Sequence, residues 1–453
     1  MKHVIASVGL VIASFSAIGQ NVPFDKAHIA DAAALKRAQE CIKAGDKMAA
    51  NGGQGLGLAL ISYEDAHDIN PNNAELNMKM GLCHLNGAQR HLALPYFQAA
   101  AELAPEMEGV HFFLGYAQQL NSNWDKAIAA YELHKRSQAA VVGDPDPRMA
   151  NIEKLMIECK NGKALSASGS SAVVSAMGPS INSEQADYGV LLSATSDQLL
   201  FTSRRATTTG GKINKATQEY FEDIYSTTRM PAGYLPPQPL LLPVNSIGND
   251  ATVCLSHDGK TLLMYRDVSG SGDIYRCDLT PAGWSEPKPL GPNINTRHHE
   301  GSAWLTADGQ WLYFVSDRPE ESLGGQDIYR SRWDAAANDW GIAENLGPDV
   351  NSAFDEDGVF ISFDGNTIWF SSKGHSSIGG YDVFVSSYEN GFWAKAKSMG
   401  MPINSPDDDL YFVLADDGMT GYFSSVRPGG EGQDDIYRVD LSPGAGDTGK
   451  AGR

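Results

Sequence analysis

Gly324-Gly325-Gln326-Asp327-Ile328-Tyr329-Arg330 joins a glycine turn to an acidic residue and then to an apolar-aromatic segment typical of a β-strand. The same order of an acid, a β-branched residue and an aromatic residue occurs five times, starting at Asp223, Asp273, Asp327, Asp382 and Asp435. The intervals between these acids are 50, 54, 55 and 53 residues. Recurrence at this period predicts supersecondary units that stack and bury a shared core.

Each repeat is predicted to form four antiparallel strands. In the third repeat these are 300–306, 310–316, a strand that begins at Asp327, and 340–346, with a tight turn at Asp308-Gly309 between the first two. Four strands in a unit of this length are typical of a propeller blade. The sequence therefore predicts a five-bladed β-propeller over residues 172–441, in which Trp284, Trp340 and Trp393 pack between neighbouring blades.

The ends of the array predict how the ring closes. The fifth repeat stops at Leu441 and lacks a fourth strand, whereas 173–178 aligns with the fourth strands of the other repeats. We expect this N-terminal strand to complete the last blade, which leaves no exposed sheet edge there.

A series of asparagines is followed, five positions on, by a series of acids: Asp187, Asp250, Glu300, Glu356 and Asp409. These acids are predicted to ring one mouth of the central channel. They could form a cation site or a binding mouth, or they could pair with loop amides and with the matched cations Arg204/Arg205, Arg266, Arg318, Lys373 and Arg427. The matched cations favour the second, structural interpretation, with no metal or cofactor. The acids that start the third strands are likewise interpreted as anchors.

A second period, of 34 residues, runs through 24–160. It relates one aromatic position and two positions with small residues, and the clearest members are Gly81, Ala93, Phe97, Gly115, Ala127 and Tyr131. We expect Gly81 and Gly115 to let a second helix approach the first, and the aromatic rings to fill the space between successive helix pairs.

This pattern resembles tetratricopeptide repeats, which implies an α-solenoid that binds peptides or proteins in a groove. A Gly/Ser/Ala-rich segment, 161–171, is predicted to link the helices to the propeller.

The N-terminus matches a secretory signal peptide, predicted as 1–19, with Lys2 before the apolar run 4–18. We expect an exported protein that is periplasmic, associated with the outer membrane, or secreted, with a polar tail at 442–453 and no transmembrane segment. The net charge of −20 excludes a nucleic-acid partner and a polybasic membrane anchor.

The five cysteines match no metal-binding spacing. They are interpreted as small buried residues. A disulfide between Cys254 and Cys277, or among Cys41, Cys83 and Cys159, remains an alternative.

The third repeat carries Asp308-Gly309, Phe314, Ser316, Arg318-Pro319 and the motif 324–330. This series resembles the bacterial TolB-type, WD40-like (PD40) propeller repeats. Signal peptide, tetratricopeptide helices and propeller together resemble Bacteroidota envelope proteins associated with type IX secretion and gliding. Those relatives often continue into an OmpA-like domain, which this sequence lacks, so direct binding of peptidoglycan is not expected.

The sequence favours a non-enzymatic scaffold that binds other envelope proteins or peptides through the helical groove and the loop-rich propeller face. No catalytic residue is predicted, because the candidate acids repeat with the blades, whereas a catalytic pair normally breaks such symmetry. The alternative is an exported carbohydrate-active propeller, with a glycosidase-like or glycan-binding channel. The blade-one loop carries Arg204, Arg205, Lys212 and Lys215, and it is either a solvated insertion or a partner-binding loop.

Overall fold

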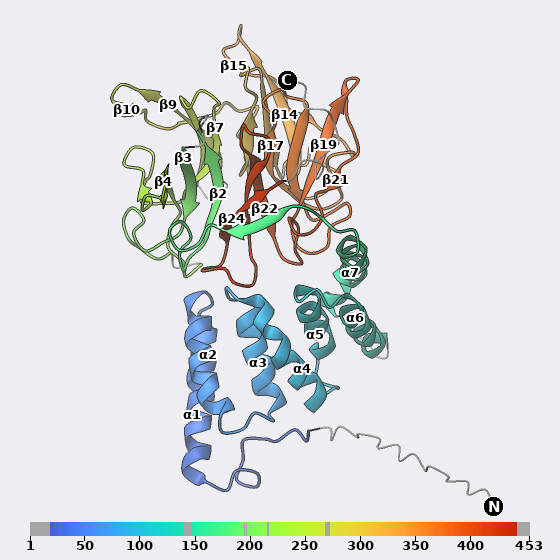
Figure 1. Ribbon diagram of the computed structural model, residues 1–453. Helices are drawn as coiled ribbons and strands as arrows, with labels where there is room; N and C mark the ends of the chain where they lie inside the picture. Colours follow the sequence, from blue (N-terminus) through green and yellow to red (C-terminus); the bar gives the residue numbers. More distant parts are fainter. Residues whose placement is uncertain are drawn as a thin grey trace, which may run out of the picture.

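The computed structural model describes residues 19–139, 146–193, 195, 197–214, 217–267 and 272–441. Two parts follow one another along the chain (Figure 1): a helical arm, residues 19–166, and a propeller, residues 172–441. The predicted signal peptide, except Gly19, and the predicted polar tail lie outside the described residues.

Helices of the arm pack side by side in chain order (Figure 1). They are α1 (Ala32–Ala49), α2 (Gln54–His67), α3 (Ala74–Leu85), the 3₁₀ helix η1 (Arg90–Ala93), α4 (Leu94–Leu103), α5 (Val110–Leu120), α6 (Trp124–Ala139), the 3₁₀ helix η2 (Pro147–Asn151) and α7 (Ile152–Ser166). No helix within these described residues is long and apolar enough to cross a membrane.

The 34-residue period reflects contacts between glycines and aromatic rings. A Cβ atom added at Gly81 would lie 2.6 Å from the Phe97 ring, and one added at Gly115 would lie 2.7 Å from the Tyr131 ring. Each ring therefore lies on a glycine of its own helix pair and also packs against the helix that follows the pair, as the sequence predicts. Of these two rings, only that of Phe97 also stacks on an aromatic ring of the next helix pair, that of Phe113, with ring centroids 5.5 Å apart. Ala93 and Ala127 are completely buried.

Replacing Gly115 by Ala is expected to lower the free energy of unfolding of the arm by about 2 kcal/mol, because the new methyl group would overlap the buried Tyr131 ring. Gly57, in α2, is the matched control. A Cβ atom there meets nothing within 4 Å, so Gly57→Ala should stabilise the arm by about 0.5 kcal/mol. Urea unfolding followed by far-ultraviolet circular dichroism measures both changes, and equal effects would contradict the packing role of Gly115.

The final helix is longer than expected. α7 ends at Ser166, so the first half of the segment predicted as a linker, 161–171, is helical. Gly162 does not break the helix. It lies beneath Trp124, whose ring would be 2.5 Å from an added Cβ atom.

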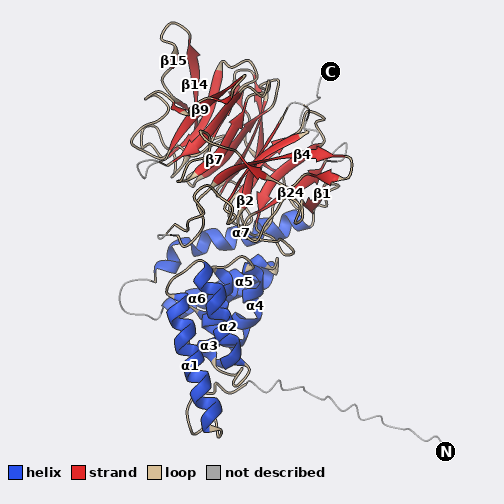
Figure 2. Cartoon of the chain, turned by 90° about the vertical axis from the view of Figure 1, so that its left-hand side faces the viewer, coloured by secondary structure: helices blue, strands red, loops and turns tan. Residues whose placement is uncertain are grey.

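The propeller consists of five sheets arranged around a channel (Figures 1 and 2). Blade one contains β2 (Asp187–Leu192), β3 (Gln198–Ser203), β4 (Asp223–Met230), β5 (Gly233–Tyr234) and β6 (Gln238–Pro239). Blade two contains β7 (Asp250–Leu255), β8 (Thr261–Arg266), β9 (Asp273–Thr280), β10 (Gly283–Trp284) and β11 (Lys288–Pro289). Blade three contains β12 (Ala303–Leu305), β13 (Trp311–Ser316), β14 (Asp327–Asp334), β15 (Asp339–Trp340) and β16 (Glu344–Asn345). Blade four contains β17 (Glu356–Ile361), β18 (Thr367–Ser372), β19 (Asp382–Glu389), β20 (Phe392–Trp393) and β21 (Lys397–Ser398).

Blade five closes the ring as the sequence predicts. It contains β22 (Asp409–Leu414), β23 (Thr420–Ser425) and β24 (Asp435–Asp440), and its outer strand is β1 (Val173–Ala176). β1 pairs antiparallel with β24, so the two ends of the propeller meet in one sheet. The five-bladed architecture is confirmed. The fourth strand of the first four blades, predicted as continuous, is instead two short segments that both pair with the third strand.

Hydrophobic clusters fill the spaces between neighbouring blades. Trp340 and Trp393 belong to two of them and Trp284 packs against a third, as predicted. Trp304, on β12, packs against four of these clusters and so lies near the middle of the ring. All five cysteines are free thiols, and only Cys41 is not buried.

Candidate functional site

The five repeat-symmetric acids do not line an open mouth, because each of their side chains is completely buried: Asp187, Asp250, Glu300, Glu356 and Asp409. Each carboxylate accepts a hydrogen bond from the backbone N–H group four residues earlier, at distances of 2.5–2.9 Å. The sequence placed four of these acids correctly at the start of an inner strand, while Glu300 precedes β12 by three residues; it placed all five wrongly around the channel mouth. Their side chains turn into the blades, where the loop amides can satisfy them.

Arginines at, or two residues beyond, the ends of the second strands complete four of these five sites. The ion pairs are Arg205–Asp187, Arg266–Asp250, Arg318–Glu300 and Arg427–Asp409. Arg318 also lies over the rings of Phe314 and Tyr329, 4.9 and 5.2 Å from their centroids. These contacts fit the structural interpretation of the two matched series, in which acids and cations hold the blades in register.

Blade four departs from this pattern. Lys373 pairs with Asp355 at 2.9 Å, not with Glu356, and Nε2 of His375 donates to the carbonyl of Val350 in place of the arginine. Glu356 is left with three hydrogen bonds, from the N–H and hydroxyl of Ser352 and the hydroxyl of Ser372. Burial raises the pKa of Glu356 to about 7.

The acids that start the third strands also lie in structural sites. Asp327 accepts from the N–H of Leu323, and Asp223, Asp382 and Asp435 accept from Thr209, Ile378 and Glu431. Asp273 starts β9 in the same way, after a loop that lies outside the described residues. The glycines of the motif let the next blade approach: a Cβ atom at Gly324 would lie 2.4 Å from the carbonyl oxygen of Phe354.

The repeated asparagines connect each blade to the one before it. Asn351 accepts from the N–H of Ile328 at 2.8 Å and donates to the carbonyl of the same residue at 2.9 Å. Asn182, Asn245, Asn295 and Asn404 make the same pair of bonds to their neighbouring third strands.

The basic loop of blade one does not present four free cations. Arg204 turns inward and pairs with Glu222 at 2.5 Å and with Glu219 at 3.2 Å, while Arg205 pairs with buried Asp187. Lys212 is exposed, and Lys215 lies outside the described residues. The alternative of a cationic partner-binding loop is therefore wrong for the two arginines, because the β3–β4 connection brings Glu219 and Glu222 to Arg204 and the start of β2 brings Asp187 to Arg205.

The helical arm contacts the loops of blades four and five. Arg90 donates to Asp407 at 2.7 Å, and Asn161 donates to the carbonyl of Ser377 at 2.9 Å. Met401 joins the hydrophobic cluster formed by α6 and α7. The arm and the propeller are thus joined by an ion pair, hydrogen bonds and an apolar contact.

The channel contains a cavity of about 260 Å³, which lies between the inner strands of all five blades. The described residues of the arm are not among those that line it. Tyr188 and Tyr411 stack across it with ring centroids 5.7 Å apart, and Tyr265 lies against His299 at 5.7 Å. Trp304 also lines this cavity.

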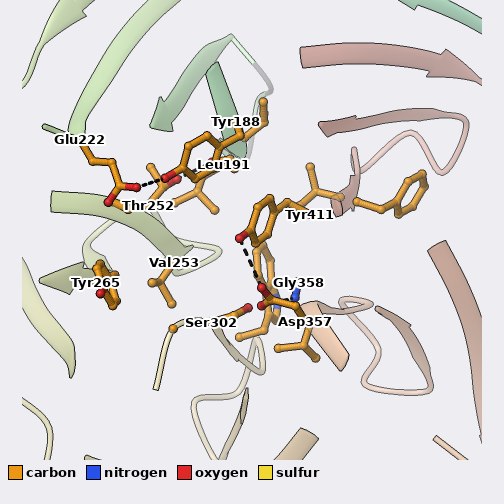
Figure 3. Close-up of a pocket in the computed structure, with 18 of the residues that line it drawn as sticks. Tyr188, Leu191, Glu222, Thr252, Val253, Tyr265, Ser302, Asp357, Gly358 and Tyr411 are labelled. Carbon is orange, nitrogen blue, oxygen red and sulfur yellow. Dashed lines mark hydrogen bonds between the residues drawn. The ribbon is translucent and has the colours of Figure 1, made fainter. Parts of the chain in front are cut away.

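Two tyrosine–carboxylate pairs face this cavity (Figure 3). The Tyr188 hydroxyl donates to Glu222 at 2.5 Å, and the Tyr411 hydroxyl donates to Asp357 at 3.4 Å. Burial raises the pKa of Asp357 and of both tyrosines. Such a cavity can hold a small polar group among aromatic rings and carboxylates.

Sequence reasoning missed this site because it followed the positions that repeat. The signal was present where the repeats differ: the residues that directly follow the five buried acids are Tyr188, Ala251, Gly301, Asp357 and Leu410. Of the sequence cluster His298-His299-Glu300, only His299 lines the cavity, because Glu300 turns into the blade. Among the described residues no group of three or more His, Cys, Asp or Glu side chains could hold a metal ion.

No protein-family model and no curated protein matches the chain. Solved structures similar to it include TolB from Acinetobacter baumannii, with 14% identity, a TM-score of 0.36, and 66% of this chain and 72% of that chain covered. They also include an α-L-arabinofuranosidase from Lactobacillus brevis, with 13% identity, a TM-score of 0.35, and 58% of this chain and 91% of that chain covered. A gluconolactonase from Xanthomonas campestris has 15% identity, a TM-score of 0.33, and 61% and 92% coverage. These likenesses concern the propeller fold and nothing finer.

Proposed function

We propose that this chain is a non-enzymatic protein-binding scaffold of the bacterial cell envelope, an accessory of a secretion or outer-membrane complex. The observation that carries the proposal is an apolar surface at the junction of blades one and two. Leu241, Leu242 and Ile247 are 81%, 76% and 77% exposed there. Exposed apolar residues that lie together favour an interaction site.

The other blade junctions have different residues at these positions. Leu241 stands where Gly291, Gly347 and Gly400 stand, and Leu242 stands where Pro292, Pro348 and Met401 stand. Met401 is the informative case, since the α6–α7 helices cover it in this structure. By the same register, we propose that Leu241 and Leu242 receive a helix of another envelope protein.

The helical arm adds a second surface. Its 34-residue period resembles that of tetratricopeptide repeats, and Leu58 and Ile61 of α2 are 54% and 61% exposed. We propose that peptides or proteins bind along these helices. The ion pair of Arg90 with Asp407 and the packing of Met401 against the helices would hold the two surfaces in a fixed relation.

A carbohydrate-active channel remains the second candidate, favoured by the rings and carboxylates of the cavity. Glu300 and Glu356 are unsuited to it because both are buried in the blades. Glu222 and Asp357 would have to act, and Glu222 already accepts from Arg204 and Tyr188. Hydrolysis of a glycan panel that Asp357→Asn abolishes would establish this candidate and overturn the scaffold.

Photo-crosslinking in the native envelope tests the scaffold. A photoreactive residue at position 242 is expected to capture one discrete partner, whereas the same residue at 292 or 348, the matched positions of other junctions, is not. The variant Leu241→Ser/Leu242→Ser should bind that partner at least about tenfold more weakly, which corresponds to about 1.4 kcal/mol, without a change in stability. Equal capture at the three positions would refute the proposal.

A further inference from the structure

The two tyrosine–carboxylate pairs of the channel cavity differ in one respect. Glu222, paired with Tyr188, already holds a guanidinium group, that of Arg204 at 2.5 Å. Asp357, paired with Tyr411, accepts from the N–H of Gly358 at 2.7 Å and from the Tyr411 hydroxyl at 3.4 Å. Among the described residues no Lys or Arg side chain forms an ion pair with Asp357, and the charges of His299 and Lys373 only partly offset the rise in its pKa that burial causes. On one wall of the cavity, the carboxylate of Glu222 therefore has both a tyrosine and an arginine as partners. On the other wall, the carboxylate of Asp357 has a tyrosine partner but no ion pair within the described part of the chain.

Tyr411 adds an observation that packing does not explain. It has a φ of +57° at a bulge in β22. Blades one and four have Gly189 and Gly358 at this position, with φ values of +65° and +61°. A bulky side chain in this conformation is strained, and strain of this kind concentrates at functional sites. Blade five thus places an aromatic ring in the channel at a position where glycine would adopt the same backbone conformation with less strain.

Two carboxylates, those of Glu222 and Asp357, line the cavity together with one guanidinium group, that of Arg204, and with His299. Lys373 also attracts Asp357 but pairs with Asp355 at 2.9 Å. A neutral ligand would leave this excess of carboxylates uncompensated, whereas a cation would offset it.

We propose that the channel cavity binds an organic cation, an alkylammonium or guanidinium group, between the Asp357 carboxylate and the rings of Tyr188 and Tyr411 (Figure 3). The carboxylate supplies the charge and the aromatic rings supply cation–π contacts. The group can come from a basic side chain of a protein or from a free polyamine. This site does not depend on the apolar surface at Leu241 and Leu242, so either can fail alone.

Calorimetry with the full chain tests the site. N-acetyl-arginine methylamide and N-acetyl-lysine methylamide represent a basic side chain, and putrescine represents a free amine. N-acetyl-citrulline methylamide has nearly the shape of the arginine probe but no charge. At least one cationic probe is expected to bind, and the citrulline probe is expected to bind at least about tenfold more weakly than arginine, if arginine is the better ligand.

Three variants test whether the cationic probe binds at Asp357. Asp357→Asn is expected to weaken binding of the cationic probe at least about tenfold, and Tyr411→Gly, which restores the residue of blades one and four, should also weaken it. Glu286→Gln, which removes an exposed carboxylate of blade two, should change nothing. A melting curve for each variant separates loss of binding from loss of fold. Binding that survives Asp357→Asn in a folded protein, tighter binding of neutral sugars than of cations, or no binding of any cationic probe at millimolar concentration would overturn the proposal.

Discussion

Replacing Glu300 by Gln is expected to lower the free energy of unfolding by about 3 kcal/mol, whereas the same replacement at Glu356 is expected to raise it at pH 8. The two glutamates occupy the same register in neighbouring blades, and both are completely buried. They differ in their cations. Arg318 donates to Glu300 at 3.2 Å and is itself buried, whereas Lys373 of blade four pairs with Asp355.

The opposite signs follow from which charge is left without a partner. Gln at position 300 can still accept from the N–H of Thr296, but its single amide oxygen cannot also accept from Ser316, and the Arg318 charge is left buried without its carboxylate. Gln at position 356 can still accept from the N–H of Ser352 and meet the two hydroxyl groups, and it removes a buried charge that has no cation. Removal of one member of a buried pair is costly, and removal of a lone buried charge is favourable.

The pH dependence gives the sharper comparison. The folded-state pKa of Glu356, about 7, lies above its ordinary value of 4.5. The folded protein therefore binds this proton more tightly than the unfolded chain does. The contribution of Glu356 to the free energy of unfolding is fully present below about pH 4.5. It falls as the pH rises to about 7 and is constant above that, and the total fall in the free energy of unfolding is about 3 kcal/mol.

Urea unfolding of wild type, Glu300→Gln and Glu356→Gln between pH 5 and 8 measures these effects. Other buried acids also titrate in this range, among them Asp407, with a pKa raised to about 7 by burial. The difference between wild type and Glu356→Gln isolates the one residue. A constant difference across this range, or a loss of stability in Glu356→Gln as large as that in Glu300→Gln, would show that Glu356 is not the uncompensated charge.

Features that repeat could be predicted from the sequence, because all five blades pack in the same way and therefore have similar residues at corresponding positions. The number of blades, the closing strand and the tryptophans between blades all follow from alignment of the repeats. Four of the five buried acids were assigned the right strand position. Their side-chain direction was not visible, because a residue at the start of an inner strand can face either the channel or the blade.

Features that occur once were harder to predict. Arg204 and Arg205 looked like a basic patch because Glu222 and Asp187, the acids that neutralise them, lie 18 residues away in the sequence. Gly162 looked like a helix breaker, yet α7 continues because the glycine makes room for Trp124. Tyr411 had no sequence signal of its own until its position could be compared with Gly189 and Gly358.

The closure of the ring allows a second large effect to be predicted at β1. Met177 donates from its N–H to the carbonyl of Ile436 at 3.0 Å. Hydrogen-bonded pairs alternate along antiparallel strands, so Ser175, opposite Arg438, is the next residue whose N–H points toward β24. Ala176, opposite Tyr437, directs its N–H away from β24. Both side chains are exposed.

Ser175→Pro is therefore expected to lower the free energy of unfolding by about 3 kcal/mol, while Ala176→Pro should cost less than about 1 kcal/mol. The first change removes a ladder bond and leaves the carbonyl of Arg438 unpaired in a strand of only four residues. It should also free the edge of β24, which favours association between chains.

Guanidinium unfolding, hydrogen exchange of the β24 amides and light scattering together measure this effect. Faster exchange on β24 and increased scattering, both confined to Ser175→Pro, are the expected results. Ala176→Pro is the matched control because it introduces the same pyrrolidine ring at the next residue of β1, which is also exposed. If both prolines cost the same, the effect would come from the backbone angle that proline imposes. If neither lowers stability, β1 would be a dispensable edge, and closure of the propeller would rest on the apolar cluster between blades four and five that contains Phe412, Phe423 and Tyr437.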